Sequence, residues 1–332
     1  MHFIRLLRPV NLVIIILTMY AMRWFFIGFL LEKDGKFVLH GEPMDFFLLV
    51  FSTVLIAGAG NIINDYFDVK TDRINRPERL IITRHLKRRW AIVTHWIFNL
   101  AAFGIAIYLS SKHESFVYLF IHLLSINLLW FYSMYFKRRF AIGNIIIAGL
   151  TGLVPILASI YFLNVYNLEA GDNNSWLNSL YRIGQDYFAF NPETNQIGQL
   201  ILNFGFSMGI FAFFTNLARE VIKDVEDIEG DKAIRAQTIP IVMGKRKTDR
   251  VIVALLSIPL LLFTGFMIFS GWLQPIEFLI VLAPIVLAIL LQLLALLQII
   301  FQKDDKKYKI ANGLLKISML SGLFTPVYLL FL

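Results

Sequence analysis

The chain of 332 residues is 58% hydrophobic and only 16% charged, which predicts an integral membrane protein and argues against a soluble domain. It contains no cysteine, so disulfides, thiolate nucleophiles, zinc ribbons and iron–sulfur clusters are excluded. In a membrane protein a formal net charge of +8 usually reflects the topology of the chain, because basic residues concentrate in cytoplasmic loops. We therefore expect no nucleic-acid partner, and the sequence implies no protein partner.

Nine apolar segments are long enough to cross a bilayer as helices. They are residues 10–31, 45–63, 90–111, 116–136, 140–165, 197–217, 250–270, 276–301 and 311–332. The sequence therefore predicts an all-α integral membrane protein, a bundle of about nine transmembrane helices in which residues 1–332 form a single polytopic domain.

Lysine and arginine gather on one side of this predicted bundle. Of the 31 such residues, 25 lie in the N-terminal segment or in the connections after the second, fourth, sixth and eighth spans, and four lie in the other connections. The bias places the N-terminus and these four connections in the cytoplasm of a multi-pass protein of the cell membrane. The long opposite connection, 166–196, is rich in turn residues and suggests no chemistry.

Residues 61–72 bring amide and carboxylate side chains to the cytoplasmic end of the second span. At about 100° per residue, a helix places five of them within an arc of roughly 100°: Asn61, Asn64, Asp65, Asp68 and Asp72. Acids at a membrane edge are costly and usually mark a functional site. The plainer alternative is a solvated helix end capped by Asn and Asp.

Residues 219–231 repeat the pattern after the sixth span. Glu220, Asp224, Asp227 and Asp231 have the same spacing as Asn61, Asp65, Asp68 and Asp72, each 159 positions later in the chain, and Lys223 borders the face. Carboxylates brought this close raise one another's pKa unless cations lie among them. Oxygen ligands without cysteine or paired histidine favour a hard cation, Mg²⁺ first. An exposed charged loop is the alternative.

An acidic cup filled with Mg²⁺ and rimmed by basic residues suits a diphosphate. We expect the metal to bridge carboxylates and phosphate oxygens, while Arg79, Lys137 and Lys223 neutralise the remaining charge. The apolar helices behind the cup would accept a hydrocarbon tail, so the sequence favours a polyprenyl diphosphate together with a lipid-soluble acceptor. Arg23, inside the first span, either contacts an anionic acceptor or extends to the interface.

At this point the motifs resemble those of the UbiA-type intramembrane prenyltransferases. The first signature is Asn64-Asp65-x-x-Asp68-x-x-x-Asp72 followed by Arg76-Pro77, and the second is Lys223-Asp224-x-x-Asp227-x-x-x-Asp231. Further similar positions, in the same order, are Arg8-Pro9, Tyr132-Ser133, Lys137-Arg138, Gly143-Asn144, Thr238-x-Pro240 and Gly244. With the nine spans, the resemblance covers nearly the whole chain.

The resemblance implies a helical bundle around a central cavity that opens laterally to lipid. It assigns catalysis to Asp68, Asp72, Asp227 and Asp231, Mg²⁺ and diphosphate binding to those four with Asn64, and a supporting role to Asp65, Asp224 and Lys223. The motifs look most like those of digeranylgeranylglyceryl phosphate synthases, which transfer a geranylgeranyl group to a hydroxyl of a prenylated glycerol phosphate.

Three alternatives remain open from the sequence. Quinone-precursor prenyltransferases share the scaffold and alkylate an aromatic carbon. A cation transporter would use the acids as an ion pathway, although transporters tend to place such groups near the bilayer midplane. A catalytically silent member is suggested by two departures from the family pattern: LIITR follows Arg79 where a Pro, Ser and Gly turn is usual, and Arg235 stands where Gly is usual.

Overall fold

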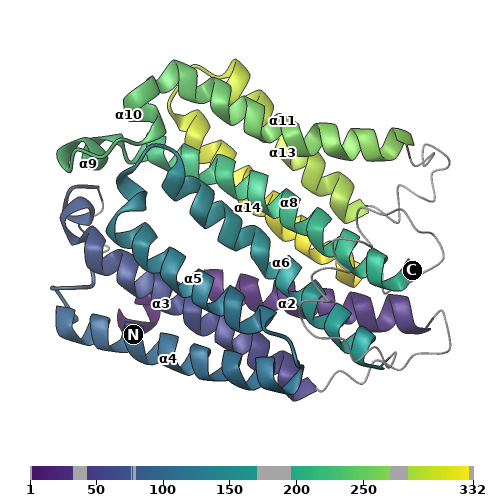
Figure 1. The fold of residues 1–332 in the computed structure, drawn as a ribbon. Helices are drawn as coiled ribbons and strands as arrows, with labels where there is room; N and C mark the ends of the chain where they lie inside the picture. The colour runs from purple at the N-terminus through teal and green to yellow at the C-terminus, as the bar shows by residue number, and fades with distance from the viewer. Residues whose placement is uncertain are drawn as a thin grey trace. The chain divides into compact units, whose positions relative to one another are not determined.

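The structure is a computed structural model that describes residues 2–32, 43–75, 77, 80–169, 196–269 and 283–328. Nearly all of the described residues are helical, and none of them belongs to a β-strand. The helices are α1 His2–Leu6, α2 Pro9–Glu32, α3 Pro43–Asn75, α4 Arg88–Lys112, α5 Val117–Met134, the 3₁₀ helix η2 Phe136–Arg138, α6 Ile142–Glu169, α8 Gln196–Glu226, α9 Ile228–Ala233, α10 Ile239–Met243, α11 Lys245–Phe269, α13 Ala283–Phe301 and α14 Lys306–Tyr328 (Figure 1).

Eight of these helices contain a stretch long and apolar enough to cross a membrane. They correspond to the first eight predicted spans, which confirms the prediction of an all-α multi-pass membrane protein. The first part of the eighth predicted span, 276–282, lies outside the described residues, as does most of the connection 166–196. The ninth predicted span lies largely in α14, where Asn312 and Lys316 reduce the apolar character, and α14 is not among the eight.

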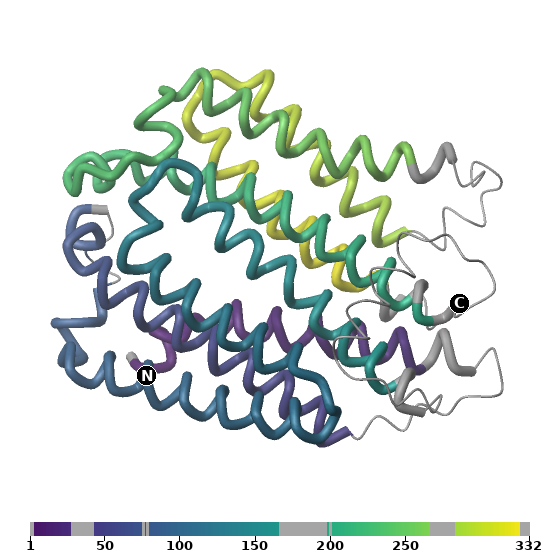
Figure 2. The backbone as a smooth tube through the Cα atoms, in the orientation of Figure 1, coloured from purple at the N-terminus to yellow at the C-terminus, as the bar shows by residue number. Residues whose placement is uncertain are grey.

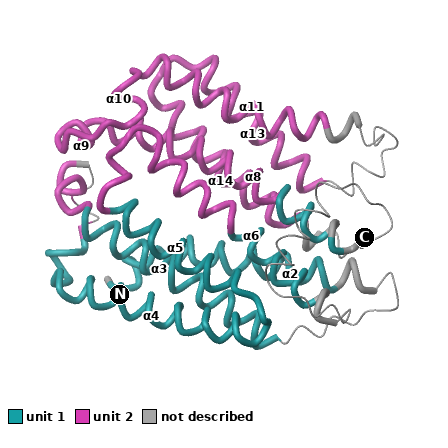
Figure 3. The backbone as a smooth tube through the Cα atoms, viewed as in Figure 1, with its two compact units in different colours: residues 1–67, 81–133, 154–207 teal, residues 68–80, 134–153, 208–332 magenta. Residues whose placement is uncertain are grey.

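The chain divides into two compact units (Figure 3). Unit 1 comprises residues 1–67, 81–133 and 154–207, and unit 2 comprises residues 68–80, 134–153 and 208–332. The boundaries fall within helices, so that α3, α6 and α8 each carry residues of both units. The single domain expected from the sequence stays a prediction.

Aromatic side chains form much of the core of unit 1. Phe25 of α2 stacks on Phe204 of α8 with 4.2 Å between the ring centroids, and Phe46 of α3 meets Tyr161 of α6 edge-on at 5.3 Å. Phe46 and Tyr161 are fully buried. Rings of this size bury a large apolar area and prefer such offset and edge-on contacts, so they join α2 to α8 and α3 to α6 within this unit.

Aliphatic packing dominates unit 2. Its core joins α8, α10, α11, α13 and α14, and it consists of Ala218, Val221, Ile222, Val225, Ile239, Ile252, Leu256, Ala295, Leu296, Ile299, Tyr308, Ala311 and Leu315. In Figures 1 and 2, α11, α13 and α14 run side by side. Asp249 of α11 reinforces this packing by accepting hydrogen bonds from Lys307 at 2.6 Å and from the Tyr308 hydroxyl at 2.8 Å.

Helices α6 and α8 approach one another closely in unit 2. A Cβ atom added to Gly152 of α6 would lie 2.7 Å from the carbonyl oxygen of Gly209 in α8. Small residues permit such close backbone approach between membrane helices. The same approach places Asn216 of α8 within hydrogen-bond distance of Thr151 of α6, at 2.9 Å, and it therefore helps to position the polar side chains that follow along α8.

Replacing Gly152 with alanine is expected to destabilise the protein, because the new methyl group would force two backbones apart. Overpacking of this kind costs roughly 1–3 kcal/mol. Gly149→Ala, in the same helix, is the matched control because nothing lies within 4 Å of its added Cβ. Thermal unfolding of both variants in detergent would measure the difference, and equal midpoints would contradict the close approach.

Candidate active site

The first acidic stretch lies entirely on α3, which continues without interruption to Asn75. Asp68 is buried, at 8% exposure, and its carboxylate forms an ion pair with the ammonium group of Lys137. Asp72 follows one turn later and is half-buried. The structure thus brings together, within unit 2, an acid of the first motif and a lysine that the sequence assigned to phosphate binding.

Lys137 belongs to the short helix η2, and a backbone contact fixes this helix against the second motif region. The backbone N–H of Gln237 donates a hydrogen bond to the carbonyl oxygen of Arg138 at 2.9 Å. Because Gln237 lies six residues after Asp231, this contact ties the two connections together. Lys137 consequently acts electrostatically on Asp231 as well as pairing with Asp68.

The sequence suggested that the second acidic stretch forms one continuous helix, but the structure divides this stretch between two helices. Helix α8 ends at Glu226 and α9 begins at Ile228, with Asp227 between them at φ −101° and ψ 11°. The backbone hydrogen bonds of Asp227 to Lys223 (2.9 Å) and of Asp231 to Asp227 (3.1 Å) nevertheless retain the i to i−4 pattern. The turn is therefore slight, and the i, i+4 relation of Asp227 and Asp231 survives.

Asp231 lies outside the membrane-spanning helices and is 8% exposed. Its burial raises the pKa of the carboxyl group to about 6; Lys137 acts in the opposite direction, and the negative charges of Asp227 and Asp68 raise the pKa further. Acids of both motifs therefore interact electrostatically within unit 2. Such a group of acids favours the binding of a cation.

A Schellman motif holds the backbone of Asp231 in place. The N–H of Ala236 donates to the carbonyl oxygen of Asp231 at 2.9 Å, and the N–H of Arg235 donates to that of Lys232 at 3.0 Å. This is the pairing that ends many helices, with a left-handed residue at the position after the cap. Arg235 occupies that position with φ 56°, which explains why glycine is suited to it.

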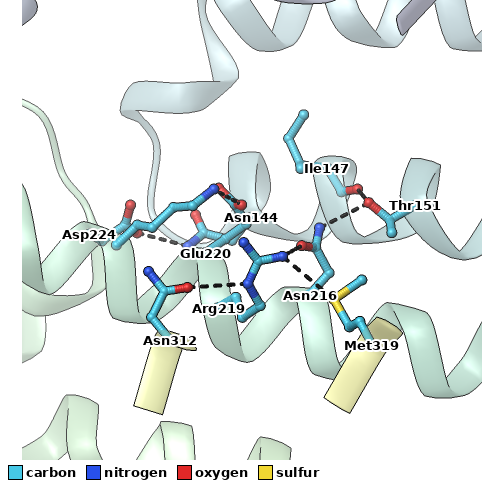
Figure 4. A network of polar contacts seen from close by, with 10 residues as sticks. Asn144, Ile147, Thr151, Asn216, Arg219, Glu220, Asp224, Asn312 and Met319 are labelled. Atoms are coloured by element: carbon cyan, nitrogen blue, oxygen red, sulfur yellow. Dashed lines mark hydrogen bonds and ion pairs between the residues drawn. The ribbon is translucent and has the colours of Figure 1, made fainter. Parts of the chain in front are cut away.

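The C-terminal third of α8 carries a polar network that faces α6 and α14 (Figure 4). Asn144 of α6 is buried and donates a hydrogen bond to Asp224 at 2.7 Å. Lys223 forms an ion pair with Glu220, one turn earlier on the same helix. Asp224 and Lys223 are thus already engaged by protein groups, which fits the supporting roles that the resemblance implies for them.

The remaining predicted site residues belong to unit 1 or lie outside the described residues. Asp65 pairs with Arg8 at 2.6 Å, and Asn64 is 9% exposed. Arg23 lies over the ring of Phe46 at 5.3 Å, and its Nη1 atom is buried without a hydrogen-bond partner among the described residues. Arg79 lies outside the described residues.

Within the described ranges, no three His, Cys, Asp or Glu side chains are close enough to form a preassembled metal site. This does not conflict with a Mg²⁺ site, because Mg²⁺ commonly takes only one or two carboxylates and completes its shell with water and substrate phosphate. The donors available, Asp68, Asp72, Asp227 and Asp231, are all oxygen ligands. The residues present therefore fit a hard divalent cation.

Sequence reasoning missed two parts of this site. Asn144 was noted only as part of a motif, and its contact with Asp224 joins residues 80 positions apart. Arg219 was counted only as a basic residue that sets topology, although it lies within a membrane-spanning helix. A charged residue inside a span is itself a signal of function, and this signal would have marked Arg219 as a candidate.

The fold and site define a polytopic helical membrane protein with acids of two distant motifs arranged around a lysine. Comparison with known proteins gives the family. Residues 21–319 match the UbiA prenyltransferase family, and the chain belongs to this family.

Curated relatives agree with this assignment. The chain is 29% identical over 324 residues to the digeranylgeranylglyceryl phosphate synthase of Methanothermobacter thermautotrophicus, covering 96% of this chain and 92% of the relative. The enzyme of the same name from Natronomonas pharaonis is 33% identical over 259 residues, covering 75% of this chain and 76% of the relative.

Solved structures share the fold at lower sequence identity. A structure described for digeranylgeranylglyceryl phosphate synthase aligns with a TM-score of 0.61 and 21% identity, covering 100% of this chain and 98% of that one. A UbiA homologue from Archaeoglobus fulgidus bound to DMAPP and Mg²⁺ aligns with a TM-score of 0.55 and 16% identity, covering 98% and 99% of the two chains.

Arg235→Gly is expected to stabilise the protein by about 1 kcal/mol, because glycine adopts a left-handed conformation without the steric cost that Arg235 bears. Arg235 is exposed, so removing its side chain should cost little packing. Arg235→Ala is the matched control, since it keeps the Cβ atom. A higher unfolding midpoint for the glycine variant alone would support the assignment, whereas an equal gain in both variants would refute it.

Proposed function

We propose that this protein transfers a polyprenyl group, geranylgeranyl in the first instance, from its diphosphate to the hydroxyl of a prenylated glycerol phosphate, with Mg²⁺ as cofactor. Membership of the UbiA family and the names of the curated relatives support this proposal. The single observation in the molecule that carries it is the arrangement of Asp68, Lys137 and Asp231 in unit 2. We further propose that this site faces the cytoplasm of the cell.

The acids are proposed to hold the metal, and Lys137 to hold phosphate. Asp68, Asp72, Asp227 and Asp231 supply oxygen ligands, with Asn64 as a further ligand from the first motif. Bound Mg²⁺ would neutralise the diphosphate and make it a better leaving group. Lys137 forms an ion pair with Asp68 and interacts electrostatically with Asp231, so a diphosphate that approaches these acids meets a positive charge. Arg79 and Lys223 are proposed to add positive charge around the same group.

The transfer itself requires no covalent intermediate with the protein. The bond between the allylic C1 and the diphosphate oxygen breaks, and its electron pair leaves with the diphosphate. A lone pair of the acceptor hydroxyl forms the new C–O bond to C1, and the hydroxyl proton passes to the departing diphosphate. The polar groups of the site stabilise the charge that develops on diphosphate, and the apolar helices keep water from the allylic cation.

The supporting contacts orient these groups. Asn144 donates a hydrogen bond to Asp224 at 2.7 Å. This bond fixes the side chain of Asp224, which lies about one turn before Asp227, the residue between α8 and α9. The Schellman pairing fixes the carbonyl of Asp231, and the bond from Gln237 to Arg138 fixes η2. These contacts preorganise the site, so that binding of metal and diphosphate costs less conformational entropy.

Asp68→Ala and Asp227→Ala are each expected to lower prenyl transfer at least a hundredfold, because each removes a proposed metal ligand. The assay uses purified protein, Mg²⁺, geranylgeranyl diphosphate and geranylgeranylglyceryl phosphate, with product and diphosphate quantified by mass spectrometry. Glu229→Gln is the matched control: Glu229 is an exposed acid of α9 outside the proposed ligand set, and its loss should leave the rate unchanged.

Metal binding provides a readout that is independent of turnover. Mn²⁺, used as a paramagnetic substitute for Mg²⁺, should bind the wild-type protein in the presence of geranylgeranyl diphosphate, and Asp227→Ala should weaken that binding at least tenfold. Retained turnover together with retained metal binding in the aspartate variants would refute the site. Transfer to an aromatic acid but not to the glycerol phosphate would replace the proposed acceptor, and ion flux in liposomes without transfer would support a transporter.

A further inference from the structure

Arg219 carries a positive charge within a membrane-spanning helix. It lies on α8 inside the apolar span Ile201–Glu226, seven residues before the end of the helix and therefore about 10 Å from that end along the axis. Its side chain is partly buried. Glu220, Lys223 and Asp224 follow it on the same helix, so Arg219 lies on the membrane side of the proposed site.

Neutral groups hold the guanidinium of Arg219 (Figure 4). Its Nε atom donates to Oδ1 of Asn312 at 3.2 Å, and its Nη1 atom donates to Oδ1 of Asn216 at 3.3 Å and contacts Sδ of Met319 at 3.5 Å. Asn216 is in turn fixed by its own hydrogen bond to Thr151 at 2.9 Å. The guanidinium is thus oriented from α6, α8 and α14, and none of its hydrogen bonds to described residues goes to a carboxylate.

The second terminal nitrogen, Nη2, has no hydrogen-bond acceptor among the described residues. In Figure 4 it is the one nitrogen of the guanidinium without a dashed line. Glu220, the nearest acid in sequence, interacts with Arg219 electrostatically, but its carboxylate forms its ion pair with Lys223. Within the described residues, Arg219 therefore has no ion-pair partner.

Placing the charge of Arg219 inside the span has a free-energy cost that a purely structural link between helices would not require. A charge inside a membrane span is expensive, and such residues usually face a polar cavity or mark a ligand site. A neutral amide could make the same contacts with Asn216 and Asn312. What the structure leaves unexplained is therefore the charge itself and the N–H groups on Nη2, which can donate charge-assisted hydrogen bonds to a phosphate or carboxylate oxygen.

We propose that Arg219 binds the phosphate group of the acceptor and so selects a phosphorylated acceptor over a neutral one. This inference rests on the proposed function. The site must hold two anions at once, because the reacting hydroxyl and the allylic C1 have to meet while both phosphates remain bound. Lys137 and the acids that would hold the metal are committed to the diphosphate near the ends of α3 and α8. Arg219 is a separate positive centre on α8, eight residues before Asp227.

The experiment compares two acceptors, geranylgeranylglyceryl phosphate and the same prenylated glycerol without its phosphate. Wild-type protein should prefer the phosphorylated acceptor in kcat/KM by about tenfold to a hundredfold, the range expected for charged hydrogen bonds. Arg219→Gln should abolish most of this preference by raising KM for the phosphorylated acceptor. Its KM for geranylgeranyl diphosphate should stay within about twofold of wild type.

Matched variants separate binding from a structural role. Lys232→Gln removes one positive charge from an exposed position of α9 and should keep the full preference. Asn312→Ala removes the acceptor of Nε but keeps the charge, so it should weaken the preference only in part. If Arg219→Gln does not fold, Arg219→Lys keeps the charge without the paired N–H groups, and it should reduce the preference by at least threefold.

The outcomes distinguish this inference from the proposed function. If wild-type protein transfers to neither acceptor, the proposed function fails. If it transfers to the phosphorylated acceptor but Arg219→Gln keeps the preference, or lowers transfer to both acceptors equally, the inference is overturned while the function stands. A rise in KM for geranylgeranyl diphosphate instead would assign Arg219 to the donor diphosphate and would also overturn the inference.

Discussion

The organisation of unit 2 depends on how buried and membrane-edge carboxylates are balanced by positive charge. Asp68 lies against Lys137, Glu220 against Lys223, and Asp224 accepts from Asn144. The ion pair of Asp68 with Lys137 links α3 to η2, and the hydrogen bond from the neutral amide of Asn144 to Asp224 links α6 to α8. Buried charges without such partners would cost several kcal/mol each.

Asp231 shows the limit of this balance. Its carboxyl group interacts with Lys137, which lowers the pKa of this group. Burial and the negative charges of Asp227 and Asp68 have the larger opposite effect, and they raise the pKa to about 6. One ammonium group is shared among several acids. A divalent cation would supply the missing positive charge, and the same physical property that makes the acids costly to bury would then make them effective ligands.

Periodicity and charge bias predicted most of the helices and the shared face of the acids on α3, because these depend on local sequence alone. The turn at Asp227 could not be predicted, since one non-helical residue leaves the spacing of the acids unchanged. The contact of Asn144 with Asp224 and the seating of Arg219 against Asn312 depend on helix packing between residues 80 and 93 positions apart. No local pattern carries that information.

At both departures from the family pattern, a residue other than glycine adopts a left-handed backbone conformation. Arg235 has φ 56° and Thr83, within LIITR, has φ 78°, both in the region that glycine adopts at least cost. Thr83 is further held in its turn by a hydrogen bond from its N–H to the carbonyl of Leu86 at 2.9 Å. Both segments therefore hold a glycine-type conformation at an energetic cost. A conformation maintained against its intrinsic preference implies that the surrounding contacts determine it, and the departures alone give no physical reason to infer an inactive site.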